Sequence, residues 1–287
     1  MGNTISVSSK RVGLALGGGG AKGLAHVPIL ETLDDLGVRP SVISGTSIGA
    51  IIGALYASGL SGRETREEIE EFLYGSEEER REHKFSITRS FRKLLDVLDL
   101  DLDFSSGGFV QGEKFLDQLY EDLKAQDFDE LEIPLKVVVS DFWSREQVVL
   151  ASGPLRPAVR ASMSLPVLFS PVVIEGRVMI DGGAVNPVPY DLLLDECDVT
   201  IAVDVSGARP QDADDPTPSL TDAVFNTFQI MSKAIVDEKR RRRPPDLYLQ
   251  PDIVDVQVLE FDRADEIFAA AGPACRELRE KLPALLG

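Results

Sequence analysis

Short apolar runs alternate with helix-like patterns between residues 11 and 59. The run RVGLALGGGG, residues 11–20, predicts a buried strand that ends in a loop of glycines. Apolar residues then recur at helical spacing until Gly37, a residue type that often ends a helix. The segment 40–45 predicts a second strand, and the apolar segment 47–59 predicts a second helix. This order predicts an α/β fold with a mainly parallel central sheet.

A strongly charged segment interrupts this pattern from about residue 61 to residue 110. We interpret it as a helical segment inserted into the domain. Within it, Phe91, Leu94 and Leu98 recur at helical spacing beside basic residues. Such a helix is either a lid or membrane-contact element, or an ordinary surface helix that packs its apolar stripe inward. The pattern alone leaves both interpretations open.

Strand-like runs return in the second half of the chain. The predicted strands lie at 133–142, 146–153, 176–183, 198–207 and 245–253. Helical periodicity predicts helices at 220–243 and 264–286, within a largely helical C-terminal part at about 219–287. No shift in composition divides the chain. We therefore predict a single domain over residues 1–287, with its core motifs at about 11–205.

The composition is ordinary for a soluble globular protein, with 43% hydrophobic and 27% charged residues. No apolar run approaches the roughly 18 residues that a membrane-spanning helix needs. The N-terminus also lacks the apolar core of a signal peptide. We therefore expect a cytoplasmic protein, with peripheral contact to a membrane surface as an option.

The net charge of −18 repels nucleic acid and, on average, anionic membranes. We therefore predict no nucleic-acid partner. The basic run from Lys239 to Arg243 has two interpretations. It is either a solvated helix end, favoured there by the helix dipole, or a local docking site for anionic lipid head groups. The sequence does not indicate the oligomeric state.

The two cysteines, Cys197 and Cys275, lack the spacing of a disulfide framework or a zinc site. We interpret both as neutral thiols, and we predict neither a metal nor a cofactor.

The glycine loop LGGGGAKGL, residues 16–24, is suited to binding an anion through backbone N–H groups. A phosphate-binding P-loop is excluded because Gly23, and not Ser or Thr, follows Lys22. The spacing of Gly18, Gly20 and Gly23 matches a dinucleotide fingerprint, but no acidic residue ends the next predicted strand. The remaining interpretation is an oxyanion hole, which requires a nucleophile nearby.

Ser47 is a candidate nucleophile, since it lies in a G-x-S-x-G pattern between a predicted strand and a predicted helix. The alternative is a serine that caps the helix. Neither His26 nor His83 is well placed to be its base. Asp181 is the better candidate, because it ends an apolar run and is followed by two glycines. The alternative role for Asp181 is that of a turn residue.

The motifs GGGGAKG, GTSIG and DGG, in this order, resemble the patatin-like phospholipase family. The segment from 160 to 189, around Asp181, is also similar to that family. The resemblance implies a three-layer α/β/α sandwich and lipid acyl-ester hydrolysis of the phospholipase A or lysophospholipase type. It implies a Ser–Asp dyad, with Ser47 as nucleophile and Asp181 as base. The implied oxyanion hole and basic position are Gly18, Gly19, Gly20 and Lys22.

Other functions remain open from the sequence. A carboxylesterase or thioesterase could use the same residues on soluble acyl esters, and a silent site could serve a regulatory or scaffold role. Lys22 either favours anionic head groups or anchors the glycine loop by hydrogen bonding. The dyad also requires a basic Asp181, although an ordinary aspartate has a pKa of about 3.9. We expect burial beside an acyl pocket to raise that pKa.

Overall fold

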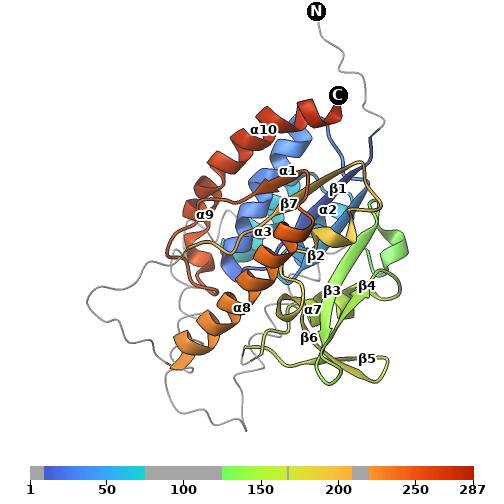
Figure 1. Ribbon diagram of the computed structural model, residues 1–287, viewed down its shortest axis with the longest axis vertical. Helices are drawn as coiled ribbons and strands as arrows, with labels where there is room; N and C mark the ends of the chain where they lie inside the picture. The colour runs from blue at the N-terminus through green and yellow to red at the C-terminus, as the bar shows by residue number, and fades with distance from the viewer. Residues whose placement is uncertain (1–9, 75–124, 167, 209–219) are drawn as a thin grey trace, which may run out of the picture.

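The computed structural model describes residues 10–74, 125–166, 168–208 and 220–287 (Figure 1). The predicted amphipathic helix that carries Phe91 lies outside these residues, as does His83. Of the inserted segment, the described part forms helix α3 (Gly62–Tyr74).

An eight-stranded sheet forms the centre of the fold. Its parallel strands, in spatial order, are β3 (Leu135–Asp141), β2 (Val42–Thr46), β1 (Val12–Leu16), β7 (Val199–Val203) and β8 (Leu247–Leu249). The antiparallel strands are β4 (Glu146–Leu150), β5 (Val172–Ile174) and β6 (Arg177–Asp181). The prediction of a mainly parallel sheet is confirmed. Strand β5, with three residues, carries too short a pattern to have been predicted.

Helices cover both faces of the sheet, as a three-layer sandwich requires (Figure 1). The remaining helices are α1 (His26–Asp35), α2 (Ile48–Ala57), α7 (Leu155–Ser162), α8 (Leu220–Arg242), α9 (Ala264–Ala270) and α10 (Gly272–Leu286). Short 3-10 turns are η1 (Gly20–Ala25), η2 (Phe128–Glu130), η3 (Gly182–Ala184), η4 (Tyr190–Leu192) and η5 (Phe261–Arg263). Within the described part of the chain, no helix is both long and apolar enough to cross a bilayer.

The cores on the two faces of the sheet differ in size. Leu14 and Leu16 of β1 join the large core, whereas Ala15 between them joins the small one, as strand alternation dictates. The large core lies under α1, α2, α3, α7, α9 and α10. The small core contains Tyr190 of η4 and Val236 of α8.

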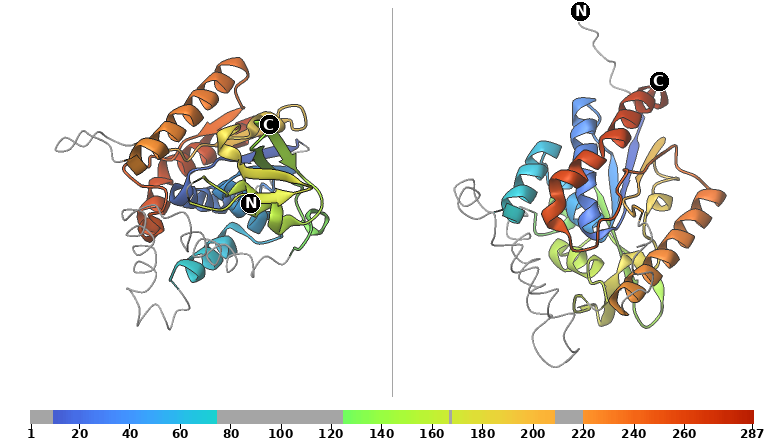
Figure 2. Two further views of the ribbon diagram at one scale, coloured as in Figure 1. Left: turned by 90° about the horizontal axis from the view of Figure 1, so that it is seen from below. Right: turned by 90° about the vertical axis from the view of Figure 1, so that its left-hand side faces the viewer.

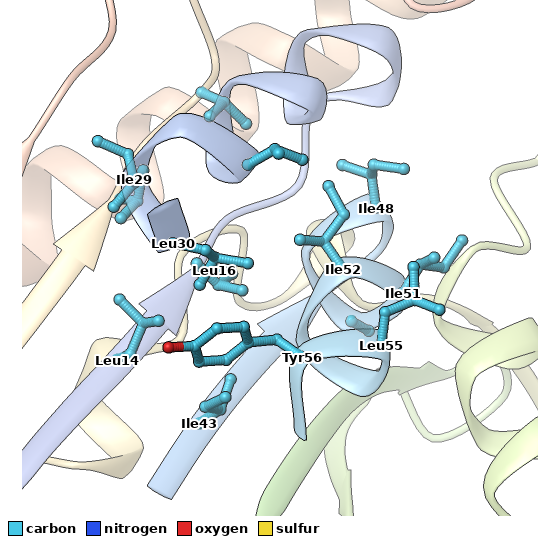
Figure 3. Close-up of a cluster of buried hydrophobic side chains, with 14 of the residues drawn as sticks. Leu14, Leu16, Ile29, Leu30, Ile43, Ile48, Ile51, Ile52, Leu55 and Tyr56 are labelled. Atoms are coloured by element: carbon cyan, nitrogen blue, oxygen red, sulfur yellow. The ribbon is translucent and has the colours of Figure 1, made fainter. Parts of the chain in front are cut away.

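Helix α2 is buried along its whole length, which explains its continuous apolar sequence. Figure 3 shows Tyr56 of this helix between Leu14 of β1 and Ile43 of β2. The Tyr56 hydroxyl donates a hydrogen bond to Asp34 at 2.6 Å, so its burial leaves no unpaired polar group. Each apolar side chain of this size contributes about 1.5–3 kcal/mol when fully buried.

Two predicted helices differ from their sequence patterns. The second half of the glycine loop forms the 3-10 turn η1, and the chain becomes α-helical only at His26. The predicted helix at 264–286 is divided into α9 and α10 by Ala271. A proline lies in the first turn of α10, where its missing N–H group costs nothing, and it prevents a continuous helix.

Candidate active site

Strand β3 brings the two predicted catalytic residues together. Because β4 pairs along one edge of β3, both β2 and β6 pair along its other edge. On that edge Thr46 of β2 lies beside Val138, and Asp181 of β6 lies beside Val139. Strand β2 runs parallel to β3 and β6 runs antiparallel, so the two strands run toward each other. Ser47, which follows Thr46, therefore meets Asp181 where both strands end.

The side chains of Ser47 and Asp181 are hydrogen-bonded. The Ser47 hydroxyl donates to Oδ2 of Asp181 at 2.7 Å, and the backbone N–H of Gly183 donates to Oδ1 at 2.7 Å. The Asp181 side chain thus forms a turn with Gly183 and also accepts a hydrogen bond from Ser47, so the turn does not exclude the predicted role as base. Asp181 is only 3% exposed. Burial raises its pKa to about 6, although the hydrogen bonds from Ser47 and Gly183 oppose this rise.

Ser47 lies on a strained turn between β2 and α2. Its φ of 54° is in the left-handed region that side chains other than glycine rarely adopt. A Cβ atom on Gly45 would lie 2.6 Å from the Gly49 carbonyl oxygen, and one on Gly49 would lie 2.2 Å from that of Leu16. The two glycines of the G-x-S-x-G pattern therefore permit the close approach of strand and helix. The Ser47 hydroxyl makes no capping bond to α2.

Ser162, at the end of α7, is hydrogen-bonded to this turn. Its side-chain oxygen accepts a hydrogen bond from the Ser47 N–H at 2.9 Å and donates one to the Val138 carbonyl oxygen at 2.6 Å. Two residues further on, the carbonyl oxygen of Ser164 accepts from the Asp181 N–H at 3.0 Å. The end of α7 thus holds the backbones of both Ser47 and Asp181. Sequence reasoning did not identify Ser162, because one serine in a helical pattern gives no local signal.

The glycine loop lies beside Ser47. A Cβ atom on Gly18 would be 3.2 Å from the Ser47 Cβ, and the Gly18 N–H donates to the Pro187 carbonyl oxygen at 2.9 Å. The Gly18 N–H is therefore already used. Within the described part of the chain, the N–H groups of Gly19 and Gly20 donate to no protein acceptor. These two amides can bind an oxyanion. Gly18 instead allows the loop to lie close to Ser47, and its N–H is already bonded to Pro187.

Gly20 is required by its conformation as well as by its surroundings. Its φ is +59°, and a Cβ atom there would lie 2.3 Å from the Val258 carbonyl oxygen. The Ala21 N–H donates to the same oxygen at 2.8 Å and thereby fixes the end of the loop.

Lys22 and His26 anchor the glycine loop through hydrogen bonds to backbone carbonyl oxygens. The Lys22 ammonium donates to the Ser206 carbonyl oxygen, and the residue is only 6% exposed. The His26 ring donates from Nε2 to the Gly17 carbonyl oxygen at 2.8 Å. Complete burial lowers the pKa of His26 to about 4, so the ring is neutral at pH 7. Of the two roles considered for Lys22, this position favours anchoring.

A pocket with a largely apolar wall opens in front of Ser47. Ser47, Asp181 and the glycine loop form one wall, and α8 forms the facing wall. The residues of α8 that line the pocket are Phe225, Phe228, Gln229, Ser232, Lys233 and Val236. The Ser232 hydroxyl donates to the Gly183 carbonyl oxygen at 3.3 Å. Sequence reasoning did not place α8 at the site, because an apolar stripe at helical spacing is equally typical of a core helix.

The basic run at the end of α8 is partly structural. The Lys239 ammonium is enclosed by Asn186, the Val188 carbonyl oxygen and Asp191. The Arg240 guanidinium lies 3.7 Å above the Tyr248 ring. These contacts hold the C-terminal end of α8 against the fold.

Cys197 and Cys275 are both free, and the second is buried. Burial raises the pKa of each thiol, which keeps the thiols neutral at pH 7.

Comparison with known families gives a match over most of the described fold. The family model for patatin-like phospholipases matches residues 14–194, which include the glycine loop, Ser47 and Asp181.

Two relatives illustrate the range of this similarity. An uncharacterized NTE family protein of Mycobacterium tuberculosis is 31% identical over 236 residues, which cover 82% of this chain and 60% of that protein. Lysophospholipase nte1 of Aspergillus fumigatus is 28% identical over 300 residues, which cover 95% of this chain and 18% of that protein. The chain thus spans about 60% of the mycobacterial relative and a much smaller part of the fungal one.

Among solved structures, VipD from Legionella pneumophila has a similar fold. The TM-score is 0.51 at 14% identity, over 95% of this chain and 67% of VipD. At this level of identity the likeness concerns the fold alone.

Proposed function

Because the chain belongs to the patatin-like phospholipase family, we propose that it is a serine hydrolase that cleaves acyl esters of lipids through a Ser–Asp dyad. Lysophospholipids and phospholipids are the proposed substrates. The fungal relative, whose name is lysophospholipase, supports this class of substrate.

In the proposed reaction, Ser47 attacks the acyl carbonyl carbon while Asp181 accepts the serine proton. The 2.7 Å hydrogen bond between them is within the distance that proton transfer requires. The alcohol of the lipid then leaves with a proton from Asp181, and the acyl group stays on Ser47. Water then attacks this acyl-enzyme while Asp181 accepts a proton from it, and Asp181 returns that proton to the Ser47 oxygen as the fatty acid leaves.

We assign the oxyanion hole to the N–H groups of Gly19 and Gly20. An amide already bonded within the protein cannot stabilise the developing negative charge, which removes Gly18 from this role. Fixed amides in a pocket with little water stabilise such charge more strongly than water does. Loss of one such donor typically costs about 2.7–4 kcal/mol of transition-state stabilisation.

The apolar wall of the pocket is where we place the acyl chain. Phe225, Phe228 and Val236 of α8 line the same pocket as Ser47. Burial of each CH₂ group of a chain against such a wall contributes about 0.8 kcal/mol. We therefore expect turnover to increase with acyl-chain length over the first few carbons.

One observation carries this proposal: the hydrogen-bonded Ser47–Asp181 pair lines a pocket with an apolar wall together with Gly19 and Gly20, whose N–H groups donate to no acceptor among the described residues. The test is turnover of a panel of lysophospholipids, phospholipids and neutral lipids, with the released fatty acids identified. We expect fatty-acid release that is lost in Ser47→Ala. Turnover of short p-nitrophenyl esters without any lipid turnover would instead indicate a soluble esterase.

A further inference from the structure

Helix α8 exposes apolar side chains on the face that points away from the pocket. Val224, Ile230 and Met231 are 44%, 68% and 55% exposed. They are three of the seven large hydrophobic residues that are exposed in the described part of the chain. Figure 2 shows α8 at the margin of the molecule in both views.

The helix is therefore apolar on two sides. Phe225, Phe228 and Val236 line the pocket, while Val224 and Met231 point outward. A helix that is apolar all round is normally buried, because exposing either apolar side to water is unfavourable. On α8 only the pocket side is covered by the described fold.

Basic residues continue the exposed stripe toward the end of the helix. Val224, Met231 and Arg242 recur at spacings that place them on one helical face, with Arg241 beside them. Arg241 and Arg242 are 73% and 79% exposed. Both pair with Glu238, but exposed pairs of this kind contribute little and can be exchanged for another anion.

Lys233 lies at the margin of the pocket. Its side chain is 71% exposed, yet the residue also lines the pocket. The pocket is therefore open to solvent beside Lys233.

We propose that the outer face of α8, defined by Val224, Ile230, Met231, Arg241 and Arg242, docks on an anionic phospholipid bilayer. The apolar stripe would enter the boundary between head groups and acyl chains, and the arginines would contact lipid phosphates. Anionic lipid phosphates match the local positive charge of Arg241 and Arg242, although the net charge of the whole chain is −18. The proposal rests on the proposed lipid hydrolysis, since docking would place α8 between the bilayer and the pocket.

The test measures flotation of the full-length protein with phosphatidylcholine vesicles that contain phosphatidylglycerol. In the first variant, Ile230→Ser is combined with Met231→Ser, and we expect vesicle affinity to fall about tenfold or more. The control is Val254→Ser, which removes a 48% exposed apolar side chain outside α8 and should leave affinity unchanged.

A second variant tests the charge. Arg241→Gln combined with Arg242→Gln should weaken binding to the anionic vesicles about 10- to 30-fold at low salt, and much less in high salt. The matched control is Arg63→Gln, because Arg63 is 84% exposed and forms the same kind of i,i+4 pair, with Glu67 of α3. This control should bind as the wild type does.

Turnover of a soluble p-nitrophenyl ester separates this inference from the proposed function. We expect both α8 variants to keep soluble-ester turnover within about twofold, because the pocket side of the helix is unchanged. Wild-type protein that hydrolyses the ester but does not float with anionic vesicles would overturn the docking surface alone. The docking surface would also be wrong if the α8 variants floated with the vesicles as the wild type does. It would be wrong as well if Ile230→Ser with Met231→Ser left vesicle binding unchanged and only dissociated a dimer in ultracentrifugation.

Discussion

The Ser47 hydroxyl lies 2.7 Å from Oδ2 of Asp181, although 134 positions separate the two residues in the chain. Their strands, β2 and β6, meet end to end along one edge of β3. The second carboxylate oxygen of Asp181 accepts a hydrogen bond from the backbone N–H of Gly183, which orients the acceptor. In the described part of the chain, the Ser47 hydroxyl is thus hydrogen-bonded to a carboxylate and not to a histidine ring.

Asp181→Asn and Ser47→Ala should each lower kcat/KM for an acyl ester about 10³-fold or more. The first removes the proposed proton acceptor, and the second removes the proposed nucleophile that donates the proton. Both should also abolish labelling by a fluorophosphonate. The control is Asp141→Asn, another buried carboxylate, which lies at the end of β3 and pairs with Arg177 instead. Near-normal turnover by Asp181→Asn would contradict the dyad.

The rate should depend on pH through Asp181. Its pKa of about 6 means that kcat/KM should fall as the pH drops below about 6, because the protonated acid cannot accept the serine proton. An aspartate with an ordinary pKa would place this decline near pH 4. Titration of His26 should not contribute to the pH dependence of kcat/KM near pH 6, since its pKa is about 4 and its ring does not line the pocket. A rate that stays constant down to pH 4.5 would show that burial does not tune this base.

The same burial should cost stability at neutral pH. The folded protein holds the Asp181 proton more tightly than the unfolded chain does, since the pKa is about 6 instead of 3.8. The resulting stability is fully present below pH 3.8 and is lost as the pH rises through about 6. Asp181→Asn avoids this loss, so it should be more stable than the wild type at pH 8, by up to about 3 kcal/mol.

Urea unfolding at pH 8 and pH 4 measures this difference. The advantage of Asp181→Asn should be largest at pH 8 and small at pH 4. A variant that is less stable at pH 8 would mean that the carboxylate contributes more through its hydrogen bonds than burial removes.

Ser162→Ala should impair catalysis beyond its effect on stability. It removes the partner of the half-buried Ser47 N–H and a hydrogen bond to the buried Val138 carbonyl oxygen, at a cost of about 1–3 kcal/mol. It also releases the strained backbone of Ser47, so kcat should fall about tenfold or more while KM changes little. We therefore describe Ser162 as a positioning residue.

Ser44→Ala is the matched control for Ser162. The Ser44 hydroxyl is also buried in β2 and donates to the Pro189 carbonyl oxygen at 3.0 Å, but it does not contact Ser47. Both variants should lower Tm by similar amounts, and only Ser162→Ala should slow fluorophosphonate labelling. An equal loss of kcat in both would reduce Ser162 to a structural role.

Lys22→Met tests the role of the buried lysine. The change removes the hydrogen bond to the Ser206 carbonyl oxygen, which should lower Tm and loosen the glycine loop. We expect kcat to fall by the same factor for a lysophospholipid and for a neutral ester with the same acyl chain. If only the lysophospholipid were affected, Lys22 would instead recognise the head group.

Much of the fold was predictable because its signals are local. The runs that became β1, β2, β3, β6 and β7 are short and largely apolar, and glycines mark where several of them end. The break between α9 and α10 was not predicted, because a proline near a helix start and one inside a helix look alike in sequence. Strand β5 exists only because β6 offers it an edge.

The sequence by itself determined which residues are available for chemistry. A serine between two glycines after a strand, a glycine loop and an aspartate before two glycines are local patterns with local physical reasons. Only the tertiary structure decided how they combine: the register along β3 places Asp181 beside Ser47, and burial there raises the pKa of the aspartate. It also assigned Ser162 to the turn, α8 to the pocket wall and Gly18 to a bond within the protein. Each of these depends on residues far apart in the chain, and strand register and burial are properties of the packed sheet as a whole.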